Sequence, residues 1–359
     1  AFAHCASLVS VDCSDKLTFI GDNAFLNCTL LVSLGDLSSV TAIEYFAFAG
    51  CSSLERLEHL DNLVSLGESV FGYGSHYTGC ISLKSIGDMP KLESMGQKCF
   101  VSCTTLETVG DLSSLKEIPY EAFDGCTSLV SIGDLNNVES IANEAFSNCS
   151  ALEHVDKLDK ITSIGQNAFK GCTALKSIGS LHNLETIGKG AFNGCSALEH
   201  VDDLYSLTRL EYDVFSHCVS LISVDCSDKL TAIGSSAFFG CKALVSIGDL
   251  SNVTSIESSV FRGCIALKSI GNMPKLESIG MQCFMGCTAL ETVGDLSSLK
   301  EIPSETFDGC TSLVSIGDLS NVTIIGSYGF NQCKKLTSIP NLGSLESVNQ
   351  FAFLSLIHI

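Results

Sequence analysis

Hydrophobic residues recur along this chain with a fixed period of 23 residues. Counted from a cysteine, Leu follows at three residues, aliphatic residues follow near six, nine, twelve and fifteen, and Phe follows at twenty, as in Leu129, Ile132, Leu135 and Phe146 after Cys126. Ser, Thr, Gly and Asp fill most positions between them. The ladder cysteines, with one six-residue insertion before the fourth, are Cys5, Cys28, Cys51, Cys80, Cys103, Cys126, Cys149, Cys172, Cys195, Cys218, Cys241, Cys264, Cys287, Cys310 and Cys333.

This period predicts stacked coils. A 23-residue unit is too short to enclose a core of its own, but identical units can cover one another's apolar side chains. Apolar residues three apart fit neither a long amphipathic helix nor a sustained strand. We therefore predict an α/β repeat solenoid, a right-handed coil with a short parallel strand in each repeat, such as Ser131 to Gly133, and a second extended piece near Ile141. The Ala-Phe segment is expected to form a short helical or 3-10 turn.

Two kinds of unit differ just after the first strand. Many have an aliphatic residue followed by Gly and usually Asp, as in Ile-Gly-Asp-Leu at 132–135, and we expect a bend there because Gly tolerates unusual dihedral angles. The units that read Val-Asp-Cys instead place Cys13 and Cys226 eight residues after the ladder cysteine. There we expect the strand to continue regularly, with the thiol facing inward.

The pattern resembles the leucine-rich repeats of the BspA-like family, whose units share the Ile-Gly segment, the Ala-Phe pair and the Cys at this same period. The resemblance covers residues 2–353, and we expect 1–353 to be a single solenoid of about 15 repeats, truncated at both ends. The resemblance implies a surface-exposed adhesion or host-interaction protein, at the cell surface or secreted. Residues 354–359 leave the repeat and resemble a translated transposase end sequence used in library preparation, so we interpret them as a non-native tail.

Charge narrows the range of partners. The 40 acidic and 20 basic residues give a net charge of −20, which disfavours binding to nucleic acid and to anionic membrane surfaces. No apolar run approaches the roughly 18 residues of a membrane span. No membrane insertion is therefore expected in this segment.

The cysteine ladder allows two interpretations. One is a disulfide framework or a string of soft-metal sites, and the other is a small buried side chain repeated once per coil. The chain contains no CxxC pair, the usual spacing of zinc ligands. We favour buried filler, with no cofactor and no metal.

An aspartate ladder lies eight residues after the cysteines. A line of carboxylates suits calcium, which takes oxygen ligands, but Asp and Asn also cap turns by accepting backbone N–H bonds. Because the nine-residue glycine-aspartate repeats of calcium-binding β-rolls are absent, we favour capping. The ladder consists of Asp36, Asp88, Asp111, Asp134, Asp203, Asp249, Asp295 and Asp318, with Asn272 and Asn341 as variants.

Candidate partner-binding residues fall in two places. On the outward face of the predicted strands, His-x-Asp pairs occur two repeats apart, too far to share one ion, and an arginine occupies the equivalent position of an earlier repeat. The insertion at 72–79 must leave the coil, and its exposed Tyr and His side chains suit an interface. The candidates are Arg56, Tyr73, His76, Tyr77, His154, Asp156, His200 and Asp202.

Enzymatic motifs are missing from the sequence. No GxxxxGK[ST], GxSxG or HExxH pattern occurs, and the repeat already accounts for most Ser, His and Asp residues. We therefore expect a non-enzymatic recognition scaffold that binds a protein or a glycan at a surface. The alternative is a structural spacer array that extends another domain outside this sequence.

Overall fold

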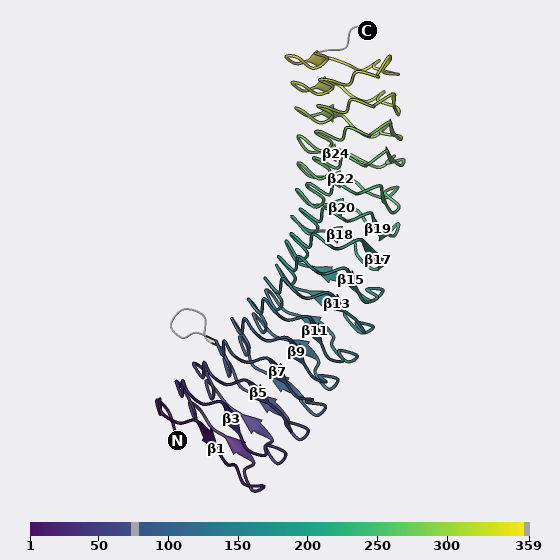
Figure 1. Cartoon of the computed structure of the whole chain (residues 1–359). Helices are drawn as coiled ribbons and strands as arrows, with labels where there is room; N and C mark the ends of the chain where they lie inside the picture. The colour runs from purple at the N-terminus through teal and green to yellow at the C-terminus, as the bar shows by residue number, and fades with distance from the viewer. Residues whose placement is uncertain (73–78, 355–359) are drawn as a thin grey trace. The chain divides into compact units, whose positions relative to one another are not determined.

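The computed structural model describes residues 1–72 and 79–354. The chain forms two compact units, Ala1–Leu181 and His182–Ile359, which are described separately below. In each unit, successive coils stack on one another, and equivalent strands of neighbouring coils lie side by side (Figure 1). This confirms the predicted solenoid of parallel strands, with two strands rather than one in most coils.

In the first unit, each first strand begins five residues after a ladder cysteine and each second strand begins fourteen after it. The first strands are β1 (Ser10–Val11), β3 (Ser33–Leu34), β5 (Arg56–Leu57), β7 (Ser85–Ile86), β9 (Thr108–Val109), β11 (Ser131–Ile132), β13 (His154–Val155) and β15 (Ser177–Ile178). The second strands are β2 (Phe19–Ile20), β4 (Ala42–Ile43), β6 (Ser65–Leu66), β8 (Ser94–Met95), β10 (Glu117–Ile118), β12 (Ser140–Ile141) and β14 (Ser163–Ile164).

The second unit has the same plan. Its first strands are β17 (His200–Leu204), β19 (Ser223–Cys226), β21 (Ser246–Ile247), β23 (Ser269–Ile270), β25 (Thr292–Val293) and β27 (Ser315–Ile316). Its second strands are β16 (Thr186–Ile187), β18 (Arg209–Leu210), β20 (Ala232–Ile233), β22 (Ser255–Ile256), β24 (Ser278–Ile279), β26 (Glu301–Ile302), β28 (Ile324–Ile325) and β29 (Ser347–Val348).

The strands pair in parallel with a register of one repeat, except that β17 and β19 shift register after Val201. Ile118 of β10 pairs with Ile141 of β12, for example, so each of these buried aliphatic side chains lies beside its counterpart in the next coil. The first strands of the first unit nevertheless form three separate groups: β1–β3, β5–β7–β9–β11 and β13–β15. The sheet is therefore interrupted between β3 and β5 and again between β11 and β13.

The third side of each coil does not form the helical or 3-10 turn that the sequence predicts. The Ala-Phe segments form consecutive β-turns, and the described residues contain no helix. In the coil that ends at Cys28, the N–H groups of Asn23, Phe25 and Asn27 donate to carbonyl oxygens of the next coil at 2.8 Å, while alternate N–H groups bond three residues back. Asn23 and Asn27 lie in the left-handed region, with φ of 55° and 57°. A helix requires negative φ throughout and keeps its hydrogen bonds within itself, so it cannot form here.

A stack of phenylalanine rings forms the centre of each unit. In the first unit, neighbouring rings such as Phe100 and Phe123 lie 5.0 Å apart between centroids, with an angle of 3° between their planes. In the second unit, Phe284 and Phe307 lie 5.3 Å apart at 4°. These rings are fully buried, as are the Leu residues three positions after each inner ladder cysteine. Stacking of equivalent side chains thus supplies the core that one coil alone cannot enclose.

The cysteines lie against this core as free thiols. All nineteen fall within the described residues, none forms a disulfide, and only Cys5 and Cys13 are not buried. Each inner ladder thiol donates a hydrogen bond to the carbonyl oxygen of a Phe in the preceding coil, as Cys51 does to Phe25 at 3.1 Å. The same Phe25 oxygen also accepts the Cys28 N–H at 3.0 Å. The interpretation as buried filler therefore agrees with the structure, which adds a donor role that the sequence did not reveal.

Candidate functional site

The candidate site is the outward face of the first strands. We call "front face" the side chains four and five residues after each ladder cysteine. The fifth residue is Ser or Thr in every repeat except three, which carry Arg56, His154 and His200. All three side chains are exposed, as predicted. The front face is therefore a row of small hydroxyls broken by three large basic or imidazole groups.

Glycine explains where the chain bends after the first strand. Gly35 and Gly110 do not lie in the left-handed region, so the expectation of unusual dihedral angles is wrong. A Cβ atom at either position would instead lie 2.6 Å from a backbone nitrogen of the preceding coil, that of Cys13 or of Asp88 respectively. Gly is required because neighbouring coils approach closely at this point.

Three coils of the first unit lack this glycine: the first coil, which has Asp12 there, and two later coils. Glu58 and Asp156 occupy its position, and the following residues, His59 and Lys157, take up the left-handed conformation with φ of 60° and 58°. A side chain at this position prevents the close approach to the coil before it. These are the coils at which the sheet is interrupted, between β3 and β5 and between β11 and β13.

A groove opens at each interruption. The first, of about 630 Å³, places Arg56 opposite the bend of the preceding coil, and its lining residues are Ser33, Leu34, Gly35, Asp36, Leu37, Ser38, Arg56, Leu57, Glu58 and His59. Arg56 and Glu58 lie 3.9 Å apart, both well exposed. An exposed pair at this distance holds the guanidinium weakly, so Arg56 remains available to a partner.

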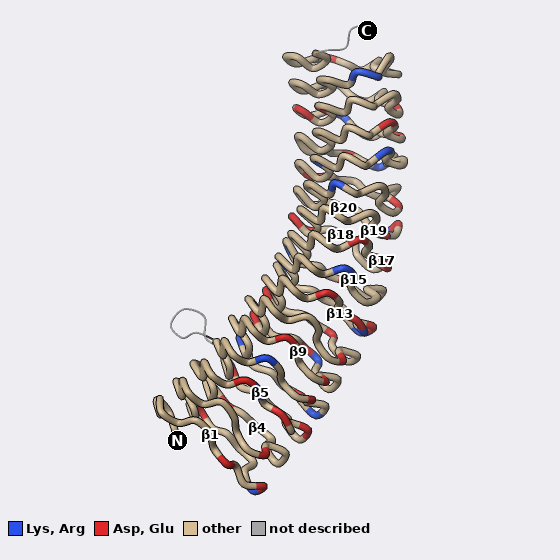
Figure 2. The backbone as a smooth tube through the Cα atoms, in the orientation of Figure 1, with Lys and Arg blue, Asp and Glu red and all other residues tan. Residues whose placement is uncertain are grey.

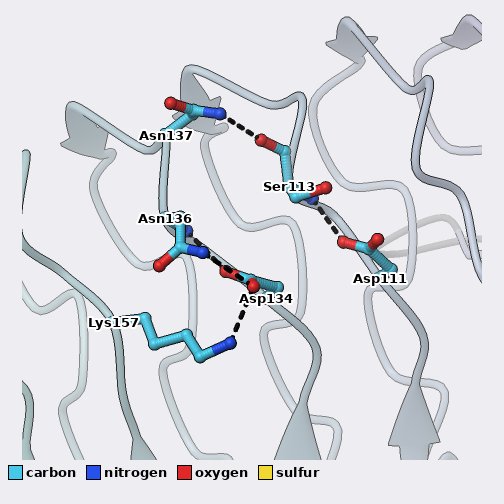
Figure 3. A network of polar contacts seen from close by, with 6 residues as sticks. All are labelled: Asp111, Ser113, Asp134, Asn136, Asn137 and Lys157. Atoms are coloured by element: carbon cyan, nitrogen blue, oxygen red, sulfur yellow. Dashed lines mark hydrogen bonds and ion pairs between the residues drawn. The ribbon is translucent and has the colours of Figure 1, made fainter.

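The second groove, of about 360 Å³, brings His154 and Asp156 together with Asp134 of the preceding coil; its other lining residues are Val130, Ser131, Ile132, Gly133, Glu153 and Lys157. The Lys157 ammonium bridges the groove to the Asp134 carboxylate at 2.7 Å (Figure 3). This ion pair lowers the pKa of Asp134. His154 Nδ1 lies 2.8 Å from the Ser177 hydroxyl of the next coil, which fixes the imidazole on the front face.

The aspartate ladder acts as a set of turn caps. Asp111 accepts the Ser113 N–H at 2.7 Å, and Asp134 accepts the Asn136 N–H at 2.9 Å (Figure 3). The Asn137 side chain then donates to the Ser113 carbonyl oxygen at 2.7 Å, which links the two coils. Such bonds to the ionised form lower a carboxyl pKa, as at Asp36 and Asp249, where the backbone N–H two residues on is the main cause.

Proline changes this cap in two coils. Asp88 and Asn272 are each followed two residues later by Pro90 or Pro274, which has no N–H to donate. Their side-chain oxygens instead accept the N–H of Asp111 or Asp295 in the next coil, at 2.9 and 3.0 Å. Seven ladder carboxylates thus accept hydrogen bonds from backbone N–H groups: those of Asp36, Asp88, Asp111, Asp134, Asp249, Asp295 and Asp318. Within the described ranges, no group of three or more His, Cys, Asp or Glu side chains is arranged to hold a metal ion.

The second His-x-Asp pair lies in the second unit on β17, the longest strand. His200 Nδ1 lies 2.9 Å from the Ser223 hydroxyl, the same arrangement as at His154, and Asp202 is exposed. The register between β17 and β19 shifts after Val201. Cys226 ends β19 with its thiol buried, as predicted, whereas β1 ends at Val11 and leaves Cys13 half-buried.

The remaining candidates, Tyr73, His76 and Tyr77, lie outside the described residues. Over the described part of the chain, no helix has the length and hydropathy of a membrane span. Acidic and basic residues are interspersed along the coils of both units, with acidic ones more frequent (Figure 2).

Comparison with protein families identifies the repeat. A family model of six copies of the BspA type leucine rich repeat region matches residues 1–130, 74–176, 162–291 and 243–359. The chain belongs to the BspA-type leucine-rich-repeat family. This confirms the resemblance noted in the sequence.

Solved leucine-rich-repeat proteins include chains that are similar to this one. The chain is similar to a leucine-rich repeat protein from Bacteroides ovatus at 28% identity, over 85% of this chain and 82% of that one, with a TM-score of 0.59. A leucine rich cell surface protein from Faecalibacterium prausnitzii is also 28% identical, over 86% and 87% of the two chains, with a TM-score of 0.49. No curated protein matches the chain.

Sequence inspection missed the grooves of this BspA-type array, although their signal is present. In each case a unit with Gly seven residues after the cysteine is followed by a unit with an acidic residue there, as Gly133 is followed by Asp156. The change marks the place where two coils cannot approach closely. Arg56, His154 and Asp156 all lie at such places.

Proposed function

We propose that this chain is a non-enzymatic protein-binding scaffold that recognises a partner through its front face and the adjoining loops with their Asp caps. We further propose that it acts at a cell surface or is secreted, in adhesion or partner recognition. The surface location rests on membership of the BspA-type family. The alternative role is a structural spacer, which does not require particular side chains at exposed positions.

The proposal rests on an internal duplication in the sequence. Residues 83–135 in the first unit and 267–319 in the second align without a gap, and they differ at nine positions: 88, 95, 97, 98, 101, 102, 105, 120 and 122 in the first copy. Eight of these lie on the consecutive turns or at their two ends. Only one, at Asp88 and Asn272, falls between the front face and the second strand.

We call "retained surface" the exposed residues between the first and second strands that are identical in 83–135 and 267–319. Two contacts in this region have the same geometry in both units. Lys91 and Lys275 each donate to the side-chain oxygen of an Asn in the preceding coil at 2.6 Å. Asn137 and Asn321 each donate to a Ser carbonyl oxygen at 2.7 Å. Apart from Asp88 and Asn272, these two stretches therefore carry the same exposed hydroxyls, ammonium groups and carboxylates after the front face.

This distribution favours recognition over spacing. A spacer needs its buried residues, but exposed Lys, Glu and Ser residues away from special contacts contribute little to stability and are free to vary. The turns have varied in this way, since Lys98 corresponds to Gln282 and Tyr120 to Ser304. Within these two stretches, the exposed residues of the front face and its loops differ only at Asp88 and Asn272, which is expected if a partner contacts them.

A non-enzymatic role is supported by the state of the thiols. Burial raises the pKa of Cys103 and Cys241 to about 12, so these side chains are protonated and shielded from solvent. Nucleophilic cysteines need a thiolate and access to substrate. The exposed imidazoles of His154 and His200 are hydrogen-bonded to serines of the neighbouring coil, an arrangement that positions them for contact with a partner.

The test is capture of extracellular matrix and host-surface proteins by the recombinant chain. The double variant Lys116→Glu, Lys300→Glu changes the retained surface in both units, and we expect it to lose capture. Each single variant should lose affinity by a larger factor than one contact explains, because two equal sites act together. Gln97→Lys, Met281→Lys on the turns is the matched control and should bind normally. Equal capture by all variants would instead support the spacer.

The insertion provides a second arm. Deletion of residues 72–79, which include the candidate Tyr and His side chains, should weaken capture if this loop contacts the partner. A spacer predicts that every interaction survives this deletion. Circular dichroism of the deleted protein checks that the coils on either side still stack.

A further inference from the structure

The front face of the second unit carries a row of four side chains with an unusual order. Val245, Lys268, Glu291 and Val314 occupy the fourth position after successive ladder cysteines, and all four are exposed. The two valines are 45% and 51% exposed, which is high for aliphatic residues on a strand face. In reverse order the row reads Val, Glu, Lys, Val. When two such rows lie antiparallel, each valine faces a valine and each charged residue faces one of opposite charge.

The two charges in this row are not engaged elsewhere in the described part of the unit. In the first unit, Lys84 pairs with Glu55 at 3.7 Å and Lys176 pairs with Glu153 at 2.7 Å. Lys268 and Glu291 form no such ion pair among the described residues. In the row, the outer neighbour of Lys268 is Val245 and the outer neighbour of Glu291 is Val314.

We propose that a second copy of this chain docks antiparallel on this row, about a two-fold axis that passes between β23 and β25. Lys268 then lies opposite Glu291 of the other copy, and Val245 lies opposite its Val314. This inference rests on the proposed role of the front face as a binding surface, and it names one partner for that surface.

Register follows from the repeat itself. Both copies have the same spacing between coils, so matching the two central charges also brings the outer residues into line. The Glu291 N–H donates to the Lys268 carbonyl oxygen at 2.8 Å and the Val314 N–H donates to Glu291 at 2.9 Å, so three members belong to one continuous stack. Val245 lies one coil further, beyond the interruption between β21 and β23.

The neighbouring side chains allow close approach. The residues that follow the four members of the row are Ser246, Ser269, Thr292 and Ser315, which are small and carry hydroxyls. The row also extends by one coil at each end, where Ile222, 39% exposed, would lie opposite Thr337. Six coils at a strand spacing of about 4.8 Å give a contact roughly 24 Å long.

The first unit does not share this property. Its corresponding row is Glu55, Lys84, Glu107 and Val130, and the antiparallel arrangement would place the Glu55 charge against Val130. The self-complementary order is therefore specific to the second unit. The proposed contact is only one row of side chains wide, so we expect association in free solution to be weak and to strengthen where molecules are concentrated side by side.

Sedimentation of the whole chain over a range of concentrations tests the proposal. Wild-type protein should show a reversible monomer–dimer equilibrium that weakens with salt. Lys268→Glu and Glu291→Lys should each raise the dimer dissociation constant about tenfold, because two attractions become two repulsions. The doubly exchanged protein Lys268→Glu, Glu291→Lys keeps a self-complementary row and should dimerise like wild type.

A mixture of the two single variants is the decisive measurement. Each should be monomeric alone, yet together they should form a mixed dimer, since the two acidic side chains of the Lys268→Glu protein face the two basic side chains of the Glu291→Lys protein. The pair Lys84→Glu, Glu107→Lys in the first unit is the control and should leave dimerisation unchanged. A monomeric wild type, undiminished dimers of the single variants, or a mixture no better than its components would overturn the proposal.

Capture of other proteins separates this inference from the proposed function. If the charge variants lose the dimer and still capture a partner, both proposals stand. If wild type is monomeric and captures a partner, only self-association fails. If wild type dimerises and captures nothing, recognition of other proteins fails and self-association stands.

Discussion

At the scale of single residues, the ladder cysteine shows why one side chain suits every coil. Its small volume fits beside the phenylalanine stack, and its S–H completes the second acceptor site of a carbonyl that already binds the next N–H, as at Phe25. Ala would fill less of the space, and Ser would bring a more polar group into it. The sequence predicted buried thiols, but the donor role could not be predicted because it depends on where the neighbouring carbonyl lies.

Thiol labelling tests this packing. In the folded protein, we expect a thiol reagent to modify Cys5 rapidly and Cys13 more slowly, because these are the two cysteines that are not buried. The remaining thiols should react only after denaturant is added, since reagents attack an accessible thiolate. Mass spectrometry after timed labelling identifies the modified sites. Rapid native labelling of Cys126 or Cys264 would contradict the buried stack.

Backbone conformation at the end of each turn supplies a second residue-scale prediction. Gly286 has φ of +73° and no atom within 4 Å of an added Cβ, so Gly286→Ala tests the left-handed conformation alone. We expect a loss of about 1 kcal/mol in the free energy of unfolding. Gly271 has equal space and no positive φ, so Gly271→Ala should change it by less than about 0.5 kcal/mol. Denaturant titration compares the two.

The first unit offers the reverse substitution. Ser102 occupies the position equivalent to Gly286 and has φ of 58°. Ser102→Gly should relieve the strain and stabilise the protein by a few tenths of a kcal/mol or more. Destabilisation by this change would mean that contacts of the serine side chain outweigh the strain of its backbone.

At the scale of elements, periodicity predicted the strands better than the turns. The aliphatic residues six and fifteen after a cysteine lie in the two strands, where most of them are buried, as at Val109 and Ile118. The Ala-Phe segment forms consecutive β-turns in place of the helical or 3-10 turn that we expect from the sequence. What decides against it is the exchange of alternate hydrogen bonds with the next coil, and no pattern within one repeat contains that information.

The candidate site, too, could be predicted only in part from the sequence. Exposure of Arg56, His154 and His200 followed from strand alternation, whereas the grooves depend on how two successive coils fit together. Gly110 makes this fit testable. Gly110→Ala places a Cβ 2.6 Å from the Asp88 nitrogen and should cost about 2–3 kcal/mol of unfolding free energy, more than Gly286→Ala. Equal effects in thermal or denaturant unfolding would show that the coils approach less closely than described here.

At the scale of the whole molecule, stability is a sum over coils and their interfaces, and the buried thiols make that sum depend on pH. Burial raises the pKa of Cys51, Cys103 and Cys241 from 9.0 to about 12. Between these values the unfolded thiol loses its proton while the folded thiol keeps it. Their stabilising contribution is therefore complete below pH 9 and is lost as the pH rises from 9 towards 12.

The loss should be steep, because each such thiol contributes about 1.4 kcal/mol per pH unit and the effect repeats along the stack. We expect thermal midpoints, followed by circular dichroism, to change little from pH 7 to 8.5 and to fall sharply above pH 9. Replacing Cys241 with Ala lowers stability at pH 7 but removes one titrating group, so this variant should show a shallower decline. A wild-type midpoint that stays constant between pH 9 and 11 would mean that the thiols titrate as freely in the folded stack as in the unfolded chain.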